Sequence, residues 1–120
     1  MDSSGSIVQL QEAVREFCER RDWDQFHNPK DLAIGIATEA GELLSLFRFL
    51  NEAESLSVLV DGRKREQVED ELADVLFFVL RFAQKAGIDL AACLTRKLAK
   101  NAMRYPIAKA RGRNVRAEDL

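Results

Sequence analysis

Residues 32–50, LAIGIATEAGELLSLFRFL, and residues 66–86, EQVEDELADVLFFVLRFAQKA, determine the fold of this 120-residue chain. Apolar residues recur every three or four positions in both stretches, which is typical of amphipathic helices. Each stretch also carries two carboxylates three residues apart, and such residues share one helical face. The four carboxylates are Glu39, Glu42, Glu71 and Asp74. Facing helices would therefore gather four acidic side chains in one place.

These carboxylates do not lie on a purely polar face. At about 100° per residue, Glu39 falls inside the apolar arc of its helix and Glu42 falls at the margin. Glu71 projects between apolar residues, and Asp74 lies just beyond the edge of its arc. Burying a charge without a partner is costly, so these positions indicate a bound cation or salt bridges. A hard divalent ion is the natural occupant of an oxygen-rich site, and a triphosphate is the commonest substrate that needs one.

The chain is predicted to be all-α with four main helices. The expected helices are Ser6 (a cap, with Gln9 completing a capping box) to about Arg21, about Pro29 to Leu50, about Glu66 to Ala86, and Asp89 (a cap) to about Arg104. Gly87 is expected to end the third helix, and Pro106 follows the end of the fourth.

The remaining segments are expected to be irregular. Residues 22–29 are expected to form a loop, and residues 51–65 a connection with a turn at Asp61-Gly62. Residues 55–60 within this connection form either a short helical turn or an irregular cover. The polar tail from about residue 107 is expected to be extended or partly disordered. A chain of this length is expected to form one domain, residues 1–120.

The second and third helices should form an antiparallel hairpin, because a single connection joins them. Residues that pair across such a hairpin have a nearly constant sum of residue numbers. Glu39 with Asp74 gives the same sum as Glu42 with Glu71. The two pairs of carboxylates should therefore lie at about the same height.

Composition excludes several classes of protein. The formal net charge of −2 argues against general nucleic-acid binding. No apolar run reaches membrane-spanning length, and the polar start lacks a signal-peptide pattern. Cys18 and Cys93 lie in helical patterns and lack C-x-x-C spacing, which predicts buried free thiols in a reducing, cytoplasmic compartment. His27 is the only histidine, which excludes an H-E-x-x-H zinc site.

Four segments resemble the MazG-like superfamily of all-α nucleoside triphosphate pyrophosphohydrolases, and especially its dCTP pyrophosphatase branch. The segments are Arg21–His27, Glu39–Leu43, Glu71–Val75 and the spaced series Lys97, Asn101 and Tyr105-Pro106. The resemblance extends over roughly residues 8 to 112. It implies a four-helix MazG-like bundle built on the antiparallel hairpin and assembled as a homotetramer or homodimer. It also implies Mg²⁺-dependent hydrolysis of a nucleoside triphosphate to the monophosphate and pyrophosphate.

The same resemblance implies roles for individual residues. The four carboxylates would hold one or more Mg²⁺ ions and activate water. Trp23 and Phe49 would stack on the base, while Asn101 and Tyr105 would line the nucleoside pocket. Lys97 lies four residues before Asn101, so both share one helical face, and Lys97 could bind phosphate as a compact cation. Lys100 and Arg104 are weaker phosphate candidates.

Three further residues are interpreted structurally or mark a departure from the branch. His27 is expected to be a loop residue packing beside Phe26 rather than a ligand, and Gly41 is expected to permit close helix approach. Val14 stands where the dCTP-specific branch has a histidine, and Phe49 replaces a tryptophan. Phenylalanine can still stack on a base, whereas loss of the histidine relaxes base selectivity.

Three functional interpretations therefore stay open. The first is a dNTP pyrophosphatase that favours dCTP. The second is a MazG-like enzyme acting on another or modified dNTP or on dUTP. The third is a non-catalytic helical oligomerisation module in which the carboxylates only form salt bridges, since 18 Lys and Arg residues are available.

Three apolar residues, Leu44, Phe77 and Leu80, lie away from the predicted packed faces. Their exposure predicts an oligomer with the nucleotide site near a subunit boundary.

Overall fold

The computed structural model describes residues 5–120, and all of the regular structure in that range is helical. The chain divides into two compact units, one ending at Gly87 and one beginning at Ile88. None of the helices within residues 5–120 is long and apolar enough to cross a membrane. The predicted all-α class is confirmed.

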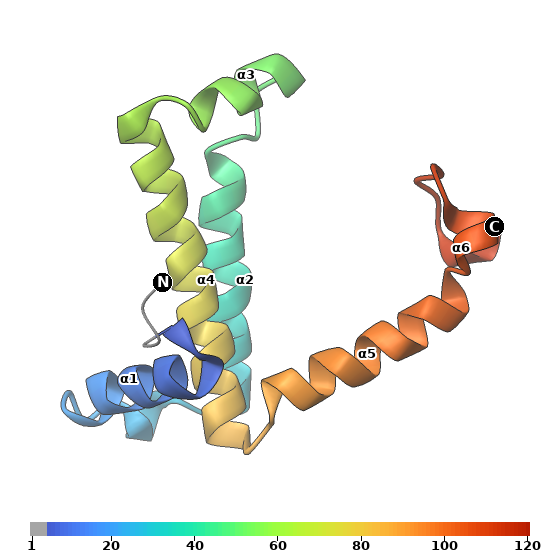
Figure 1. Ribbon diagram of the computed structural model, residues 1–120. Helices are drawn as coiled ribbons and strands as arrows, with labels where there is room; N and C mark the ends of the chain where they lie inside the picture. Colours follow the sequence, from blue (N-terminus) through green and yellow to red (C-terminus); the bar gives the residue numbers. More distant parts are fainter. Residues whose placement is uncertain (1–4) are drawn as a thin grey trace. The chain divides into compact units, whose positions relative to one another are not determined.

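The first unit is built on a helical hairpin (Figure 1). Its elements are α1 (Ile7–Glu19), the 3₁₀ turn η2 (Asp24–Phe26), α2 (Pro29–Ser45), α3 (Glu52–Val58) and α4 (Gly62–Ala86). Helices α2 and α4 run side by side in opposite directions, and α1 packs against the carboxyl-terminal half of α4. Helix α3 connects the other ends of α2 and α4. The antiparallel hairpin expected from the sequence is therefore present.

The second unit consists of α5 (Leu90–Arg104), α6 (Ile107–Ala110) and the 3₁₀ turn η3 (Ala117–Asp119). The Asp89 side chain accepts a hydrogen bond from the backbone N–H of Ala92, as expected for a cap of α5. The prediction of an extended tail from residue 107 was wrong in part, because α6 and η3 are helical.

Side-chain caps and a glycine set several helix ends where the sequence placed them. Ser6 and Gln9 form the predicted capping box at the start of α1. Gly87 ends α4 with φ of 68°, a left-handed conformation that favours glycine. Pro29 lies in the first turn of α2, after Asn28, whose side chain caps the helix.

Two predicted boundaries of the hairpin were wrong. Helix α2 ends at Ser45 rather than Leu50, and turns carry the chain to α3. Helix α4 begins at Gly62 rather than Glu66, because the Asp61 side chain accepts hydrogen bonds from the backbone N–H groups of Arg63 and Lys64 at 3.1 Å each. Asp61-Gly62 is therefore a helix start, not a free turn.

The core of the first unit lies where α1, α2 and α4 meet. Its fully buried apolar side chains include Cys18, Leu32 and Leu80. Leu80 had been expected to lie away from the packed faces, but it is only 2% exposed because α1 covers that side of α4. Leu44, in contrast, is 61% exposed, as expected.

Helices α2 and α4 approach closely at Gly35. A Cβ atom added to Gly35 would lie 2.5 Å from two ring carbons of Phe78, so the ring occupies the space that a side chain would need. A Cβ added to Gly41 would meet no atom of residues 5–120 within 4 Å. The expectation that Gly41 permits close helix approach was therefore wrong for this chain, and Gly35 has that role.

A buried arginine ties the loop before α2 to α4. Arg81 has no exposed surface, and its Nε donates to His27 Nδ1 at 2.8 Å. Its terminal nitrogens donate to carboxylate and amide oxygens of Asp24 and Gln84. His27 is thus a loop residue as expected, and the hydrogen bond from Arg81 anchors it.

Gly35→Ala should destabilise the protein, since forcing a methyl group into a packed contact costs about 1–3 kcal/mol. Gly41→Ala is the matched control. It should leave stability unchanged or raise it, because alanine in a helix is favoured over glycine by roughly 0.5–1 kcal/mol. Urea unfolding followed by circular dichroism measures both variants. Equal stability of the two would contradict the close contact at Gly35.

Stability should fall as the pH drops below about 6.5, the ordinary pKa of histidine. Burial, and then the positive charges of Arg81 and Lys85, lower the pKa of His27, while Asp24 opposes this. The unfolded chain therefore takes up a proton that the folded chain does not, so acid favours unfolding.

His27→Gln keeps a side-chain acceptor for Arg81 but cannot titrate. Between about pH 7.5 and about pH 5.5 its melting temperature should fall less than that of the unmodified chain. Thermal melts in matched buffers measure the difference. Parallel curves for the two proteins would show that His27 does not take part in the linkage.

Candidate functional site

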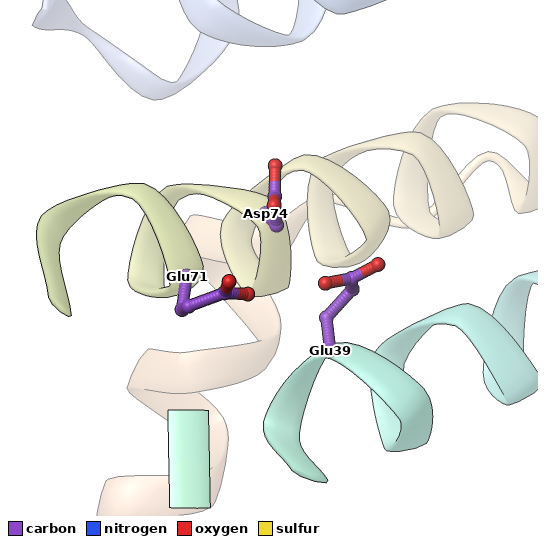
Figure 2. Close-up of side chains that lie close together, drawn as sticks. All are labelled: Glu39, Glu71 and Asp74. Carbon is purple, nitrogen blue, oxygen red and sulfur yellow. The ribbon is translucent and has the colours of Figure 1, made fainter. Parts of the chain in front are cut away.

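Three carboxylates meet in the middle of the hairpin (Figure 2). Glu39 projects from α2, and Glu71 and Asp74 project from α4. One oxygen of each side chain lies within 4.8 Å of the others. Glu42, the fourth predicted member, is exposed and does not belong to this group, although its charge still acts on Glu71.

The close contact at Gly35 explains why these side chains converge. Glu39 lies one helical turn after Gly35, and Asp74 lies one turn before Phe78. The glycine brings α2 and α4 together at that level, so carboxylates one turn away face each other across a short gap. Glu39 and Glu71 are half-buried as a result, whereas Asp74 stays exposed.

The cluster is electrostatically uncompensated. Within residues 5–120, none of its carboxylates forms an ion pair with a lysine or arginine. Burial, and then the negative charges of Asp74 and Glu39, raise the pKa of Glu71 above its ordinary value. Convergent, unpaired oxygen donors are the chemistry that suits a hard divalent cation. Glu39, Glu71 and Asp74 are therefore the residues that could hold one.

The two predicted stacking residues lie at opposite ends of the hairpin. Trp23 lies beside α1 and the carboxyl-terminal half of α4, with its ring centroid 5.7 Å from that of Phe17. Phe49 follows α2 near α3 and is 85% exposed. The 17 residues of α2 separate them, which corresponds to about 25 Å of helix. One chain does not bring Trp23 and Phe49 together.

The remaining predicted residues belong to the second unit. Lys97 and Asn101 lie four residues apart on α5, and Tyr105 follows its end. The backbone N–H of Tyr105 donates to the Asn101 carbonyl at 2.8 Å, and the Arg104 guanidinium lies 5.8 Å from the centre of the Tyr105 ring. Asn101 is half-buried, and Lys97 is exposed.

Sequence reasoning missed the residues that support the site. Arg81 lies inside the run VLFFVLRFA, and a charged residue within such an apolar run is the signal that could have identified it. The role of Gly35 in close helix approach could not be identified from the sequence, because several glycines and alanines occur along α2. The ring of Phe78 that needs this glycine comes from a distant part of the chain.

The chain resembles proteins of known structure and name. Residues 34–120 match the model of the MazG-like family. The chain is 34% identical to rat (Rattus norvegicus) dCTP pyrophosphatase 1 over 88% of its own length and 62% of the relative, so it spans less than two thirds of that protein. It is 30% identical to the bovine (Bos taurus) dCTP pyrophosphatase 1 over 98% of its length and 70% of the relative.

A solved structure provides a third comparison. The crystal structure of a pyrophosphatase from Archaeoglobus fulgidus is 37% identical, with a TM-score of 0.78 over 83% of this chain and 92% of the other. The helical hairpin, the convergent carboxylates and these similarities agree, and the chain belongs to the MazG-like family.

Proposed function

We propose that this chain hydrolyses deoxynucleoside triphosphates to the monophosphate and pyrophosphate in a Mg²⁺-dependent reaction that favours dCTP. The observation that carries the proposal is the convergence of Glu39, Glu71 and Asp74. Among residues 5–120, no lysine or arginine forms an ion pair with any of the three. Relatives named dCTP pyrophosphatase 1 and a neighbour named pyrophosphatase support the reaction class and the base.

In this proposal, Glu39, Glu71 and Asp74 hold one or more Mg²⁺ ions, and Glu42 assists from the margin. When bound, the metal neutralises the triphosphate and polarises its α-phosphoryl group. Water attacks the α-phosphorus in line, and the bond to the bridging oxygen breaks, so that pyrophosphate leaves with the electron pair. One of the four carboxylates accepts the proton of the attacking water.

The nucleoside is proposed to bind between aromatic residues of two copies of the chain. Trp23 and Phe49 of one chain lie too far apart to contact one base, so a base that stacks on both must take one from each copy. Asn101 and Tyr105 line the nucleoside pocket, and Lys97 binds phosphate. Both units act together as one functional domain, since the family match covers parts of both.

Exposed apolar surface supports the proposal that the four-helix MazG-like bundle, built on the antiparallel hairpin, assembles as a homodimer or homotetramer. A groove of about 490 Å³ follows one face of α4. Its lining residues are Glu69, Leu72, Ala73, Val75, Leu76 and Val79. Leu72 is 55% exposed, which is high for a leucine in the middle of a helix, and oligomers bury such patches.

A cytoplasmic location is part of the proposal because Cys18 and Cys93 are free thiols.

A second substrate class, another or modified dNTP or dUTP, remains a specific alternative. Val14 stands where the dCTP-specific branch has a histidine, so a polar contact to the base is lost, whereas Phe49 replaces a tryptophan and can still stack on the base. The non-catalytic alternative required the carboxylates to form salt bridges, and the described residues form none at the cluster.

Pyrophosphate release from a panel of dNTPs, with and without Mg²⁺, tests the function directly. Glu71→Gln should lower kcat by about 10²-fold or more. It should also raise the metal-free melting temperature, because one repelling charge is lost, and reduce the Mg²⁺-induced rise seen in the unmodified protein.

Glu66→Gln is the matched control, because it makes the same change on α4 outside the cluster. It should keep both activity and the Mg²⁺-induced rise in melting temperature. If Glu71→Gln kept near-normal turnover, or if Mg²⁺ stabilised all three proteins equally, Glu71 would not be part of the metal site.

The subunit arrangement can be tested by mixing defective copies. Trp23→Ala and Phe49→Ala should each raise KM roughly 5- to 150-fold, the range expected for loss of one base-stacking contact. Co-expression of the two variants with different tags should yield mixed assemblies in which one site has both aromatic residues. That fraction should regain the KM of the unmodified protein in steady-state kinetics.

Co-expression of two differently tagged copies of Trp23→Ala is the control, since no site then regains a tryptophan. A mixed assembly that is no better than its parents, or a fully active monomer by light scattering, would rule out the shared base site.

A further inference from the structure

Arg81 is the largest fully buried side chain of the described structure. Its three nitrogens reach three different partners: Nε donates to His27 Nδ1 at 2.8 Å, and the terminal nitrogens donate to Asp24 and Gln84. Burying a guanidinium without such partners is expensive, so the position requires this complete set. Because two of the partners lie in the loop before α2, Arg81 joins that loop to α4.

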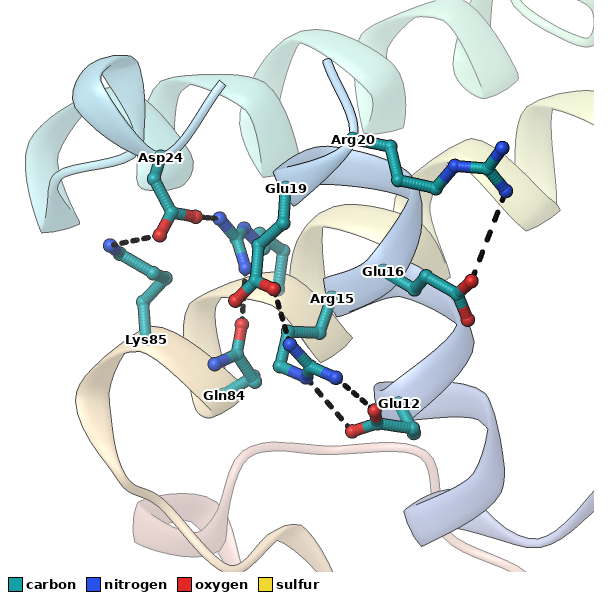
Figure 3. A network of polar contacts seen from close by, with 9 residues as sticks. Glu12, Arg15, Glu16, Glu19, Arg20, Asp24, Gln84 and Lys85 are labelled. Atoms are coloured by element: carbon teal, nitrogen blue, oxygen red, sulfur yellow. Dashed lines mark hydrogen bonds and ion pairs between the residues drawn. The ribbon is translucent and has the colours of Figure 1, made fainter. Parts of the chain in front are cut away.

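These contacts hold both ends of one short turn. Asp24 begins η2, and His27 is the residue that caps its end. A second cation, Lys85, has its Nζ 3.9 Å from the other carboxylate oxygen of Asp24 (Figure 3). Trp23 directly precedes the turn as its amino-terminal cap. The backbone that carries Trp23 is therefore fixed to α4 on its carboxyl-terminal side.

The indole of Trp23 packs against two rings, one of which accepts a hydrogen bond from Arg81. The Trp23 ring centroid lies 5.7 Å from Phe17 and 6.3 Å from His27, both in edge-to-face arrangements. The hydrogen bond from Arg81 sets the plane of the His27 ring, because it enters at Nδ1. Trp23 is still 38% exposed, so part of its ring is free for contact.

The loop also contains a backbone conformation that needs support. Asp22 has φ of 55°, the left-handed region that a residue with a side chain rarely adopts. The Gln25 side-chain amide donates to the Asp22 carbonyl at 3.0 Å and to its carboxylate at 3.1 Å. Such conformations persist where surrounding contacts determine them, and they concentrate at binding sites. The whole segment from Asp22 to His27 is thus held in one shape.

We propose that Arg81 is a positioning residue for the nucleotide base: it locks the turn Asp24–His27 so that Trp23 presents its free face before the substrate arrives. This rests on the proposed function, in which Trp23 stacks on the base. If the Trp23 ring is ordered beforehand, substrate binding does not have to offset the entropy lost on immobilising that ring. The effect therefore appears in the binding free energy rather than in the chemical step. A merely structural arginine would lower stability and leave the order of Trp23 and the KM unchanged in variants that stay folded.

Trp23 is the only tryptophan of the chain, so intrinsic fluorescence reports on it alone. Arg81→Met preserves the bulk of the side chain without donors, and Arg81→Lys keeps the charge without the planar fork. Asp24→Asn weakens one arm of the network at a half-exposed residue and serves if Arg81→Met does not fold. Arg15→Lys is the control, because Arg15 also pairs with two carboxylates but lies on the surface of α1.

Circular dichroism first establishes that each variant is folded. In Arg81→Met, acrylamide quenching of Trp23 should rise about twofold or more, and its anisotropy should fall. The KM for dCTP should increase roughly 5-fold or more with kcat within about 3-fold, since only part of the stacking contribution is lost. Arg81→Lys and Asp24→Asn should fall between this variant and the unmodified protein, and Arg15→Lys should match the unmodified protein.

A folded variant with unchanged Trp23 quenching and anisotropy would overturn the proposal, and so would disorder of Trp23 without a change in KM. The fluorescence arm needs no substrate. If the unmodified protein hydrolyses none of the dNTPs, the proposed function fails, while quenching still decides whether Arg81 orders Trp23.

Discussion

The contact between Gly35 and Phe78 is the constraint on which the rest of the structure depends. The absence of a side chain at Gly35 lets α2 approach the Phe78 ring on α4. The same approach forces Glu39 toward Glu71 and Asp74, whose oxygens then lie within 4.8 Å of one another. Apolar packing at one level of the hairpin therefore offsets the electrostatic repulsion between the carboxylates that it holds together one turn away.

A continuous row of aromatic rings extends that constraint to the loop before α2. Phe78 meets Phe77, Phe77 meets Phe17, and Phe17 meets Trp23, with successive centroids between 5.2 and 6.0 Å apart. Trp23 in turn meets His27, whose Nδ1 accepts a hydrogen bond from the buried Arg81. The acidic cluster and the exposed tryptophan thus share one packed support, so a change in the core between α1 and α4 reaches both.

Local signals predicted the parts of this structure that local physics controls. The capping box at Ser6, the glycine at the end of α4 and the cap at Asp89 depend on residues a few positions apart, and all three are present. The hairpin register followed from the nearly constant sum of residue numbers that antiparallel helices impose on facing residues. The convergence of Glu39 with Glu71 and Asp74 was therefore accessible from the sequence.

Features that depend on distant partners were not accessible in this way. The need for Gly35 depends on the ring of Phe78, which lies on the other helix, whereas close approach had been expected at Gly41, between the two glutamates. From the sequence alone, Arg81 is an interruption of an apolar face, because its partners on the loop are not known.

Charge is distributed unevenly along the chain. Residues 88–120 contain eight Lys and Arg against three Asp and Glu, although the chain is net acidic. The first unit, which holds the carboxylate cluster, is therefore the acidic one, and the second unit is basic. Two units of opposite charge suit ligands of opposite sign: the oxygen donors of the first suit a hard cation, and the lysines and arginines of the second suit an anion.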